Sequence, residues 1–442
     1  MIKSLFKNSI VTLLTWETRV VLARYKPRVI AITGSVGKTS TKDAVWSVLS
    51  ARVSVRKSEK SFNSELGVPL TVLGLKNGWS NPFIWFAHIC RGAWLALGFR
   101  SKTVSYPKWL ILEIGADRPG DIEKVSKWLS PDVVIITRFG TVPVHVEFFK
   151  SQKEVIREKS FLVKALKDTG LLLLNNDDAD VRALRSIKET CRTCKISTWG
   201  VDTPSDVQAT HIDFTYESED NVSKPTGITF RVENDGNSIP VHIDNTVGRQ
   251  HIYPALCALA LGKAFNFNVI KMAESLKGHR TPPGRMRLID GVKNTTIIDD
   301  TYNASPIAVE EALRTLKDIH ISGKKIAVLG DMLELGRFSS QEHRKVGARA
   351  KDACDILVTV GVRARDIAEG ALENMMDEKN VFQFDSNKEA KKFVQELLKE
   401  GDCVLVKGSQ GVRMEKIVEE IMAHPELKEE LLVRQEKEWK VR

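Results

Sequence analysis

Short runs of Val, Ile and Leu that alternate with helical patterns constrain the fold of this 442-residue chain more than any other feature. Each run ends in polar residues, and the eight runs cover 29–33, 109–114, 133–137, 171–175, 295–300, 325–331, 355–360 and 403–407. Strands that are apolar throughout are buried on both faces, so this alternation predicts parallel sheets covered by helices. We therefore expect an α/β fold.

Two other stretches indicate how the chain is divided. Residues 198–247 alternate apolar and polar side chains without a helical pattern, which predicts a small antiparallel β insertion. The segment RTPPGRM at 280–286, with two prolines and a glycine, predicts a domain boundary. We expect an N-terminal amphipathic helix, a central domain, a C-terminal domain and a charged tail, over 1–27, 28–281, 282–425 and 426–442.

Composition limits the partners and the compartment. The formal net charge of +10 suits an anionic partner, such as a nucleotide, a nucleic acid or an acidic membrane face. The six cysteines are scattered and no secretory signal is evident, which favours a reducing cytoplasm. Cys191 and Cys194 lack the further ligands of a zinc site, so we interpret them as structural thiols.

Two apolar segments raise the question of a membrane. Residues 1–28 carry charges throughout and lack a cleavage site, which indicates an amphipathic helix rather than a signal peptide. Packing on the core is the favoured interpretation, and peripheral contact with the inner membrane face through 1–24 or 81–99 is the second. Segment 81–99 approaches transmembrane length, but His88 and Arg91 in its middle would be costly in a bilayer, so we expect a buried or interfacial helix.

The segment VIAITGSVGKTSTKDAVWSVL, residues 29–49, has the order strand, glycine-bounded turn, helix. A phosphate-binding loop needs glycines for close approach, a lysine for the terminal phosphates and a hydroxyl for the metal. Gly34, Gly37, Lys38 and Thr39 supply these groups. The first glycine stands three residues before Gly37 instead of five, yet the context favours a nucleoside triphosphate site over a chance turn.

Polar residues stand at the carboxyl ends of the predicted strands, where ligands bind in such sheets. Glu113 ends an apolar strand, and a lone buried carboxylate is costly, so metal binding is favoured over structural pairing. Asp299 and Asp300 either bind ligand or cap the following helix. His145 fits a hydrogen-bonded loop residue and a ligand equally well. Lys159, taken alone, is typical of a solvated helix lysine.

TGSVGKTST resembles the nucleotide loop of the Mur ligase family, the ATP-dependent amide-bond-forming enzymes of peptidoglycan synthesis. The resemblance continues in order through about residues 28 to 420, in FNSELGVPLTVL, LEIGADRPGDI, HVEFFKSQKEVIREKSFL, LLLLNNDDADV, IIDDTYNASPIAVEEAL, VLGDMLELG and VLVKGSQGVRMEKIV. The last three are most similar to the branch that adds D-alanyl-D-alanine to UDP-N-acetylmuramoyl tripeptide.

The resemblance implies a fold and a reaction. The fold would be a P-loop-type parallel-sheet ATPase domain followed by a Rossmann-like C-terminal domain. ATP would phosphorylate the terminal carboxylate of the tripeptide, and the amine of D-alanyl-D-alanine would attack the acyl phosphate. It also implies a cytoplasmic monomer of cell wall biogenesis, cell shape and cell division, with no nucleic acid partner and with closure of the C-terminal domain during the reaction.

It also implies roles for individual residues. The catalytic group would be Lys38, Glu113, His145 and Lys159, and two Mg²⁺ ions would be held by Thr39, Glu113, His145 and a carbamylated Lys159. ATP would be bound by Gly34, Ser35, Gly37, Lys38, Thr39, Ser40, Asn175, Arg285, Asp300, Tyr302 and Asn303. Substrate would contact Asn63, Lys407 and Ser409.

Three departures from the family pattern keep alternatives open. Members usually begin with a separate UDP-binding domain, which we expect this chain to lack because its nucleotide loop starts at Gly34. VGRQHIYP at 247–254 and ITRFGTVPVHVE at 136–147 differ from the usual family segments. One alternative is therefore a family ligase with a lipid-linked or non-UDP acceptor. Another is a non-catalytic nucleotide-binding partner.

Overall fold

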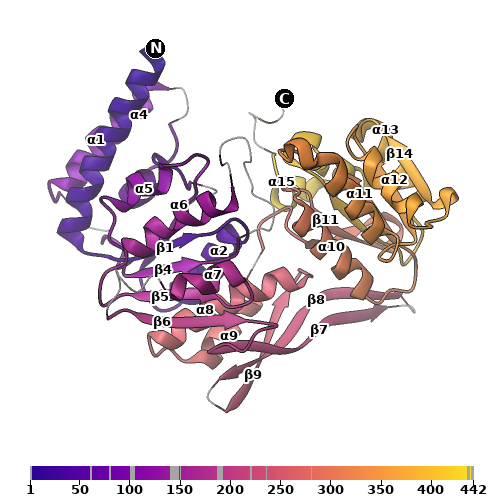
Figure 1. Ribbon diagram of the computed structural model, residues 1–442, viewed down its shortest axis with the longest axis horizontal. Coiled ribbons are helices and arrows are strands. Elements are labelled where there is room, and N and C mark those ends of the chain that lie inside the picture. Colours follow the sequence, from indigo (N-terminus) through magenta and orange to yellow (C-terminus); the bar gives the residue numbers. More distant parts are fainter. Residues whose placement is uncertain are drawn as a thin grey trace. The chain divides into compact units, whose positions relative to one another are not determined.

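A computed structural model describes residues 2–59, 62–78, 81–99, 105–139, 149, 151–186, 193–219, 222–234, 236–279, 281–435 and 439. The chain divides into two compact units, and Figure 1 shows their elements. Unit 1 comprises Met1–Ala209, Val232–Ile239 and Tyr253–Leu276, and unit 2 comprises Thr210–Arg231, Pro240–Ile252 and Lys277–Arg442.

The larger sheet has nine strands in the order β2-β3-β1-β4-β5-β6-β7-β8-β9. Its first seven strands are parallel to their neighbours: β2 (Val55–Lys57), β3 (Trp109–Glu113), β1 (Arg28–Thr33), β4 (Val133–Ile136), β5 (Leu171–Asn175), β6 (Lys195–Gly200) and β7 (Val207–Glu219). β8 (Val222–Asn234) and β9 (Asn237–Asp244) follow β7 without an intervening helix, where the alternating pattern predicts an insertion. Ile32 of β1 pairs with Glu113 of β3, so Glu113 lies beside the start of the nucleotide loop.

The helices that accompany this sheet are α1 (Ile2–Tyr25), α2 (Lys38–Ser50), α3 (Gly67–Leu73), α4 (Pro82–Ala96), α5 (Asp121–Ser126), α6 (Gln152–Lys164), α7 (Ala179–Ala183), α8 (Ile252–Ala264) and α9 (Val269–Lys277). α1 is packed on the core, because Leu14 and Val21 join a buried cluster with Val29 and Leu110 of the sheet. Within the described residues, no helix is long and apolar enough to cross a bilayer.

The sheet of unit 2 has six strands: β10 (Arg287–Gly291), β11 (Thr295–Asp300), β15 (Cys403–Lys407), β12 (Lys325–Gly330), β13 (Ile356–Val360) and β14 (Val381–Phe384), in that spatial order. Only the β10–β11 pair is antiparallel among the pairings of this sheet. The helices are α10 (Pro306–Asp318), α11 (Ser339–Ala350), α12 (Arg365–Glu373), α13 (Asn387–Leu397), α14 (Glu415–Ile421) and α15 (Lys428–Leu431). Asp300 pairs with Lys407 across β11 and β15, which brings two predicted site residues together.

The tail differs from the solvated or frayed segment that its charge predicts. Arg434 is buried and donates hydrogen bonds to the Thr301 carbonyl at 3.1 Å and to Glu415 Oε2 at 3.0 Å. Arg434 also donates to the Tyr302 carbonyl. A buried guanidinium with three acceptors holds its own segment of chain in place, so this part of the tail is packed within unit 2.

Candidate active site

The nucleotide loop joins β1 to α2 and needs both of its glycines. Gly37 precedes α2 with φ 85°, a left-handed conformation that favours glycine. Gly34 has φ 147°, and a Cβ added there would lie 1.9 Å from Thr137 Oγ1. Thr137 Oγ1 in turn donates a hydrogen bond to the Val36 carbonyl at 2.7 Å. Thr137, the residue after β4, therefore holds the loop through its hydroxyl group. The same hydroxyl leaves no room for a side chain at residue 34.

The first turn of α2 offers N–H groups to an anion. No described side chain caps this helix, and the first N–H groups of an α-helix have no partner within the helix. The amides of Ser35 and Val36 already donate to the Arg138 carbonyl, at 2.7 and 3.3 Å. The amides of Lys38, Thr39 and Ser40 are therefore the ones placed to receive a phosphate, whereas the Ser35 amide supports the loop.

Two lysine ammonium groups meet at the Gly34 carbonyl. Lys38 Nζ and Lys159 Nζ each donate to this oxygen at 3.0 Å, and Lys38 also donates to the Ser35 carbonyl at 3.3 Å. Burial, followed by the charge of Lys38, lowers the pKa of Lys159 to about 7. Lys159 is thus a buried residue and not the solvated helix lysine that its position alone suggests. The Lys38 ammonium beside a helix N-terminus suits a polyphosphate.

Glu113 faces the same turn of α2. Its Oε1 accepts a hydrogen bond from Thr39 Oγ1 at 3.1 Å, and its Oε2 lies 3.7 Å from Lys42 Nζ. Oε2 is buried and accepts no hydrogen bond from the described residues. A hydroxyl and a carboxylate with a spare buried oxygen are ligands that Mg²⁺ prefers, so this pair fits the predicted metal site.

The other predicted ligands are placed only in part. His145 lies outside the described residues. Among the residues that are described, no group of three or more His, Cys, Asp or Glu side chains is arranged to hold a metal. Asn63 lies at the end of β3, because its carbonyl accepts the Gly115 amide at 2.8 Å. Asn175 is buried at the end of β5, where its Oδ1 accepts the Asp177 amide at 3.0 Å and forms a turn.

Two contributors to this site were not predicted. Lys42 follows Thr39 by three residues on α2, and this spacing could have indicated that both share the face that meets Glu113. Glu158 accepts the amides of Gly120, Ile122 and Glu123 at 2.9, 2.7 and 3.2 Å. It thereby holds α6 against the start of α5 and positions its neighbour Lys159. Nothing near residue 158 indicates this role, because the partner amides lie far away in the sequence.

Unit 2 carries a second polar cluster at the carboxyl ends of β11 and β15. Lys407 Nζ donates to Asp300 Oδ2 at 2.6 Å and to the Asn303 carbonyl at 3.0 Å, and both charged side chains are buried. Ser409 Oγ donates to the Ala304 carbonyl at 3.3 Å and accepts the Leu333 amide at 2.9 Å. The segments DDTYNASP, GDMLELG and KGSQG therefore meet within one unit.

The remaining predicted residues of unit 2 lie around Tyr302. The Arg285 guanidinium carbon lies 4.2 Å from the centroid of the Tyr302 ring, a cation–π contact. Asp299 accepts the Thr301 hydroxyl at 2.6 Å and the Gly284 amide at 3.0 Å, and burial raises its pKa to about 6. The helix-capping interpretation of Asp299 and Asp300 is wrong, because the residue at the N-cap of α10 is Ser305.

Comparison with known protein families now identifies the chain. The Mur ligase middle domain matches residues 97–262, and the glutamate ligase domain of Mur ligases matches residues 284–410. Together these matches span more than half of the sequence. The chain belongs to the Mur ligase family. Ligases of this family form amide bonds with ATP and release ADP, so this Mur ligase is an enzyme of that class, as the resemblance implies.

Individual relatives agree with this assignment. UDP-N-acetylmuramoyl-tripeptide--D-alanyl-D-alanine ligase of Bacillus subtilis is 29% identical over 90% of this chain and 76% of its own length. The ligase of the same name from Escherichia coli is 27% identical over 88% and 76%. The crystal structure of MurF ligase from Thermotoga maritima in complex with ADP is 25% identical, with a TM-score of 0.73 over 93% of this chain and 83% of that one. MurF from Acinetobacter baumannii gives a TM-score of 0.74 at 25% identity, over 92% and 79%. The expected fold class is confirmed.

Proposed function

We propose that this Mur ligase couples ATP hydrolysis to the joining of UDP-N-acetylmuramoyl tripeptide and D-alanyl-D-alanine, as a step of peptidoglycan synthesis. The observation that carries the proposal is the convergence of Lys38 and Lys159 on the Gly34 carbonyl, while the next residue, Thr39, is hydrogen-bonded to Glu113. Similarity to ligases of that name over about nine tenths of the chain supports the choice of substrates.

The residues of the loop would act mainly by position and charge. The triphosphate would lie against the first turn of α2, with Lys38 neutralising its terminal oxygens. Transfer of the terminal phosphoryl group to the peptide carboxylate gives an acyl phosphate and ADP. The amine of D-alanyl-D-alanine then attacks the acyl carbon, the bond between that carbon and the bridging phosphate oxygen breaks, and phosphate leaves as the amine loses a proton.

Thr39 and Glu113 would hold Mg²⁺, together with His145. Bound Mg²⁺ would spread the negative charge that develops on the transferred phosphoryl group. The spare buried oxygen of Glu113 supports this assignment, since Lys42 alone shares that oxygen within the part of the chain that the structure describes. Lys42 places a cation 3.7 Å from that oxygen.

Lys159 has the property that carbamylation needs. With a pKa of about 7, a large share of the side chain is the neutral amine near neutral pH, and only this form attacks carbon dioxide. The amine would add to carbon dioxide, forming a carbamate and releasing one proton, which replaces a cation by a metal-binding carboxylate. Carbon-13 NMR with labelled bicarbonate should show one carbamate signal that is lost in Lys159→Met. Lys164→Met, at an exposed lysine of the same helix, is the matched control and should keep the signal.

The polar residues of unit 2 would complete the two binding tasks. We assign Arg285, Asp300, Tyr302 and Asn303 to the nucleotide, and Lys407 and Ser409 to the peptide substrate. Their meeting at the carboxyl ends of β11 and β15 supports this assignment, because ligands bind at that edge of such sheets. Asn63 and Asn175 lie by the carboxyl ends of strands β3 and β5 in unit 1. We assign Asn63 to the acceptor and Asn175 to the nucleotide. Nucleotide titration of Asp300→Asn and Ser409→Ala separates the tasks, since only the first should weaken ADP binding.

The deciding experiment measures phosphate release with ATP, Mg²⁺ and both acceptors, then with each acceptor omitted. We expect release only when both are present, and a pentapeptide product by mass spectrometry. Release that needs ATP and neither acceptor would contradict ligase chemistry. Release with D-alanyl-D-alanine and a lipid-linked peptide, but not with the UDP-linked peptide, would favour the alternative acceptor.

A further inference from the structure

Helix α4 has an outward face that is apolar from end to end. Its buried stripe consists of Trp85, Gly92 and Ala96. The opposite stripe, at helical spacing, is formed by Phe83, Phe86, Cys90, Trp94 and Leu97, which are all exposed. Soluble helices place polar residues on the face away from the core, so an apolar outer face indicates a further partner.

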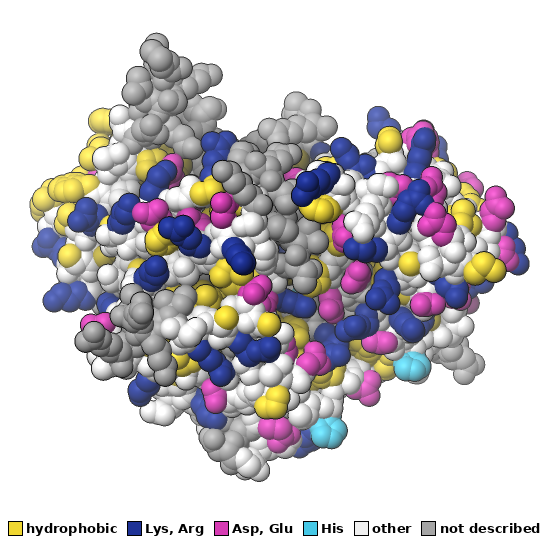
Figure 2. All heavy atoms as spheres, viewed as in Figure 1, with side chains coloured by type: hydrophobic (Ala, Val, Ile, Leu, Met, Phe, Trp, Pro, Cys, Tyr) yellow, Lys and Arg dark blue, Asp and Glu magenta, His cyan; other side chains and the backbone are white. Residues whose placement is uncertain are grey.

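The exposure of these side chains is large. Phe83 is 83% exposed, Phe86 70%, Leu97 67% and Trp94 48%. Trp94 stacks on exposed Phe99, with 6.0 Å between ring centroids. These two rings therefore pack against each other at the surface. Figure 2 shows hydrophobic side chains gathered at the left edge of the molecule, where Figure 1 places α1 and α4.

Helix α1 lies beside α4 and adds to the same surface. Its Arg24 donates a hydrogen bond to the Ala96 carbonyl at 3.1 Å, which ties the two helices together. Among its described side chains, the exposed large apolar residues are Leu13 and Trp16. We call the exposed apolar residues of α1 and α4, with Leu97 and Phe99, the aromatic face.

The charges around the aromatic face have one sign. Among the described side chains of α1 and α4, the exposed charged residues are Arg19, Arg24 and Arg91, all cationic. The only carboxyl group of the two helices, Glu17, is buried, and burial raises its pKa to about 7. A surface that presents aromatic rings among cations is complementary to anionic lipid.

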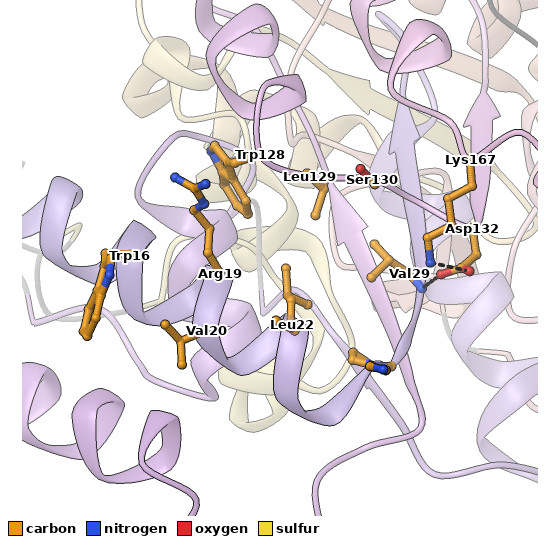
Figure 3. Close-up of a pocket in the computed structure, with 13 residues that line it drawn as sticks. Trp16, Arg19, Val20, Leu22, Val29, Trp128, Leu129, Ser130, Asp132 and Lys167 are labelled. Atoms are coloured by element: carbon orange, nitrogen blue, oxygen red, sulfur yellow. Dashed lines mark hydrogen bonds and ion pairs between the residues drawn. The ribbon is translucent and has the colours of Figure 1, made fainter.

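A pocket of about 700 Å³ borders α1 and extends the cationic rim. Trp16, Arg19 and Lys26 line it from α1 and the residue after it, and Trp128 and Lys167 line it from neighbouring segments. Figure 3 shows Arg19 extending toward Trp128, whereas Lys167 is paired with Asp132 at 2.7 Å. Arg19 and Lys26 are exposed, so both charges are accessible beside the pocket.

We propose that the aromatic face docks this enzyme on an anionic lipid surface. The aromatic rings would enter the interface between head groups and acyl chains, and the arginines would contact phosphates. A second copy of the chain fits less well, because a symmetric contact would bring two cationic rims together in a molecule of net charge +10. This proposal does not rest on the proposed reaction, since lipid binding is measured without substrates.

The test is co-sedimentation of the full chain with vesicles. One set contains phosphatidylglycerol and phosphatidylcholine, and the other contains phosphatidylcholine alone. We expect the wild type to sediment with the anionic vesicles and the Phe86→Ser/Trp94→Ser variant to bind them at least about tenfold more weakly. Arg19→Gln/Arg91→Gln should lose about fivefold for each charge and show a smaller salt dependence.

Matched controls separate docking from misfolding. Val362 and Met375 are exposed apolar residues of unit 2, so Val362→Ser/Met375→Ser should bind vesicles like the wild type. Cys90 is the exposed one among the described free cysteines, and a polarity-sensitive dye on it should shift to the blue with anionic vesicles. A dye signal that persists in Cys90→Ser would come from another site and be subtracted.

Three outcomes would overturn the proposal. The wild type would remain in the supernatant with anionic vesicles, or the Phe86→Ser/Trp94→Ser variant would bind them unchanged while the Cys90 dye does not shift. The third is a dimer in sedimentation equilibrium that the same variant abolishes, which would assign the aromatic face to a second copy.

Discussion

Lys159 of α6 in unit 1 and Lys407 at the end of β15 in unit 2 are both buried, yet the groups around them differ. Lys407 donates to a carboxylate, Asp300, at 2.6 Å, whereas Lys159 donates to a backbone carbonyl, that of Gly34, at 3.0 Å. Within the described residues, no carboxylate oxygen comes within 4.0 Å of Lys159 Nζ. The difference shows how one residue type serves as a fixed ion pair in one unit and as an amine with a pKa of about 7 in the other.

The largest effect should come from Lys38→Ala, which removes the cation that shares the Gly34 carbonyl with Lys159. We expect turnover to fall by about three orders of magnitude or more, because charge on the transferred phosphoryl group is no longer neutralised. The pKa of Lys159 should rise at the same time, since Lys38 contributes to lowering it. Phosphate release measures the first effect and NMR titration of labelled lysine the second. Product formation at the wild-type rate would sink the ligase mechanism.

Lys407→Met should destabilise the enzyme by about 3 to 5 kcal/mol, because it leaves the buried Asp300 carboxylate without its cation. Urea unfolding monitored by circular dichroism measures the loss. The double variant Asp300→Asn/Lys407→Met is the control, and it should recover part of the stability since no buried charge remains. If the double variant is no more stable than the single one, the ion pair is not the cause.

Lys159→Met should have the opposite effect on stability. In buffer free of carbon dioxide at pH 7, we expect the free energy of unfolding to increase by on the order of 3 kcal/mol. The reason is that the variant removes a buried amine whose protonation is unfavourable in the folded state. The unfolded chain binds more protons than the folded one between pH 7 and 10.5, so wild-type stability at this site rises across that window. The advantage of the variant should therefore shrink as pH approaches 10.5. A constant difference across the window would contradict the lowered pKa.

Glu17→Gln extends the comparison to a buried acid, and it should change stability less than the variants above. Glu17 Oε2 has no hydrogen-bond partner among the described residues, and burial raises the pKa of the carboxyl group from 4.5 to about 7. The folded state therefore holds a proton that the unfolded chain releases between these values, and wild-type stability falls as pH rises from 4.5 to 7. Above pH 7 the variant should be more stable by on the order of 2 kcal/mol. Thermal unfolding at pH 4 and pH 8 checks this, and equal differences at both would contradict it.

Much of the fold could be predicted from the sequence because apolar strands and glycine-bounded turns are local signals. The eight strand runs match β1, β3, β4, β5, β11, β12, β13 and β15 to within one residue at each end. The loop residues Gly34, Gly37 and Lys38 could be assigned for the same reason. The antiparallel insertion and the packed N-terminal helix also followed from periodicity.

The contacts that tune the site could not be predicted in this way. Lys42 with Glu113 and Glu158 with the start of α5 join residues far apart in the chain, and neither position breaks a local pattern. Lys159 resembled a solvated lysine because the sequence of α6 does not show which face is buried. The roles of the site residues stay predictions, His145 included.

Glu158 accepts hydrogen bonds from three amides at the start of α5, so hydrogen exchange at these amides depends on the position of α6 and of its residue Lys159. Any motion that draws α6 away from α5 must first break charge-assisted hydrogen bonds from Gly120, Ile122 and Glu123. Deuterium would then enter these backbone positions at the rate of that opening, and a bound nucleotide would slow the exchange if it clamps Lys159 in place. Exchange at these amides can thus report on the motion of Lys159.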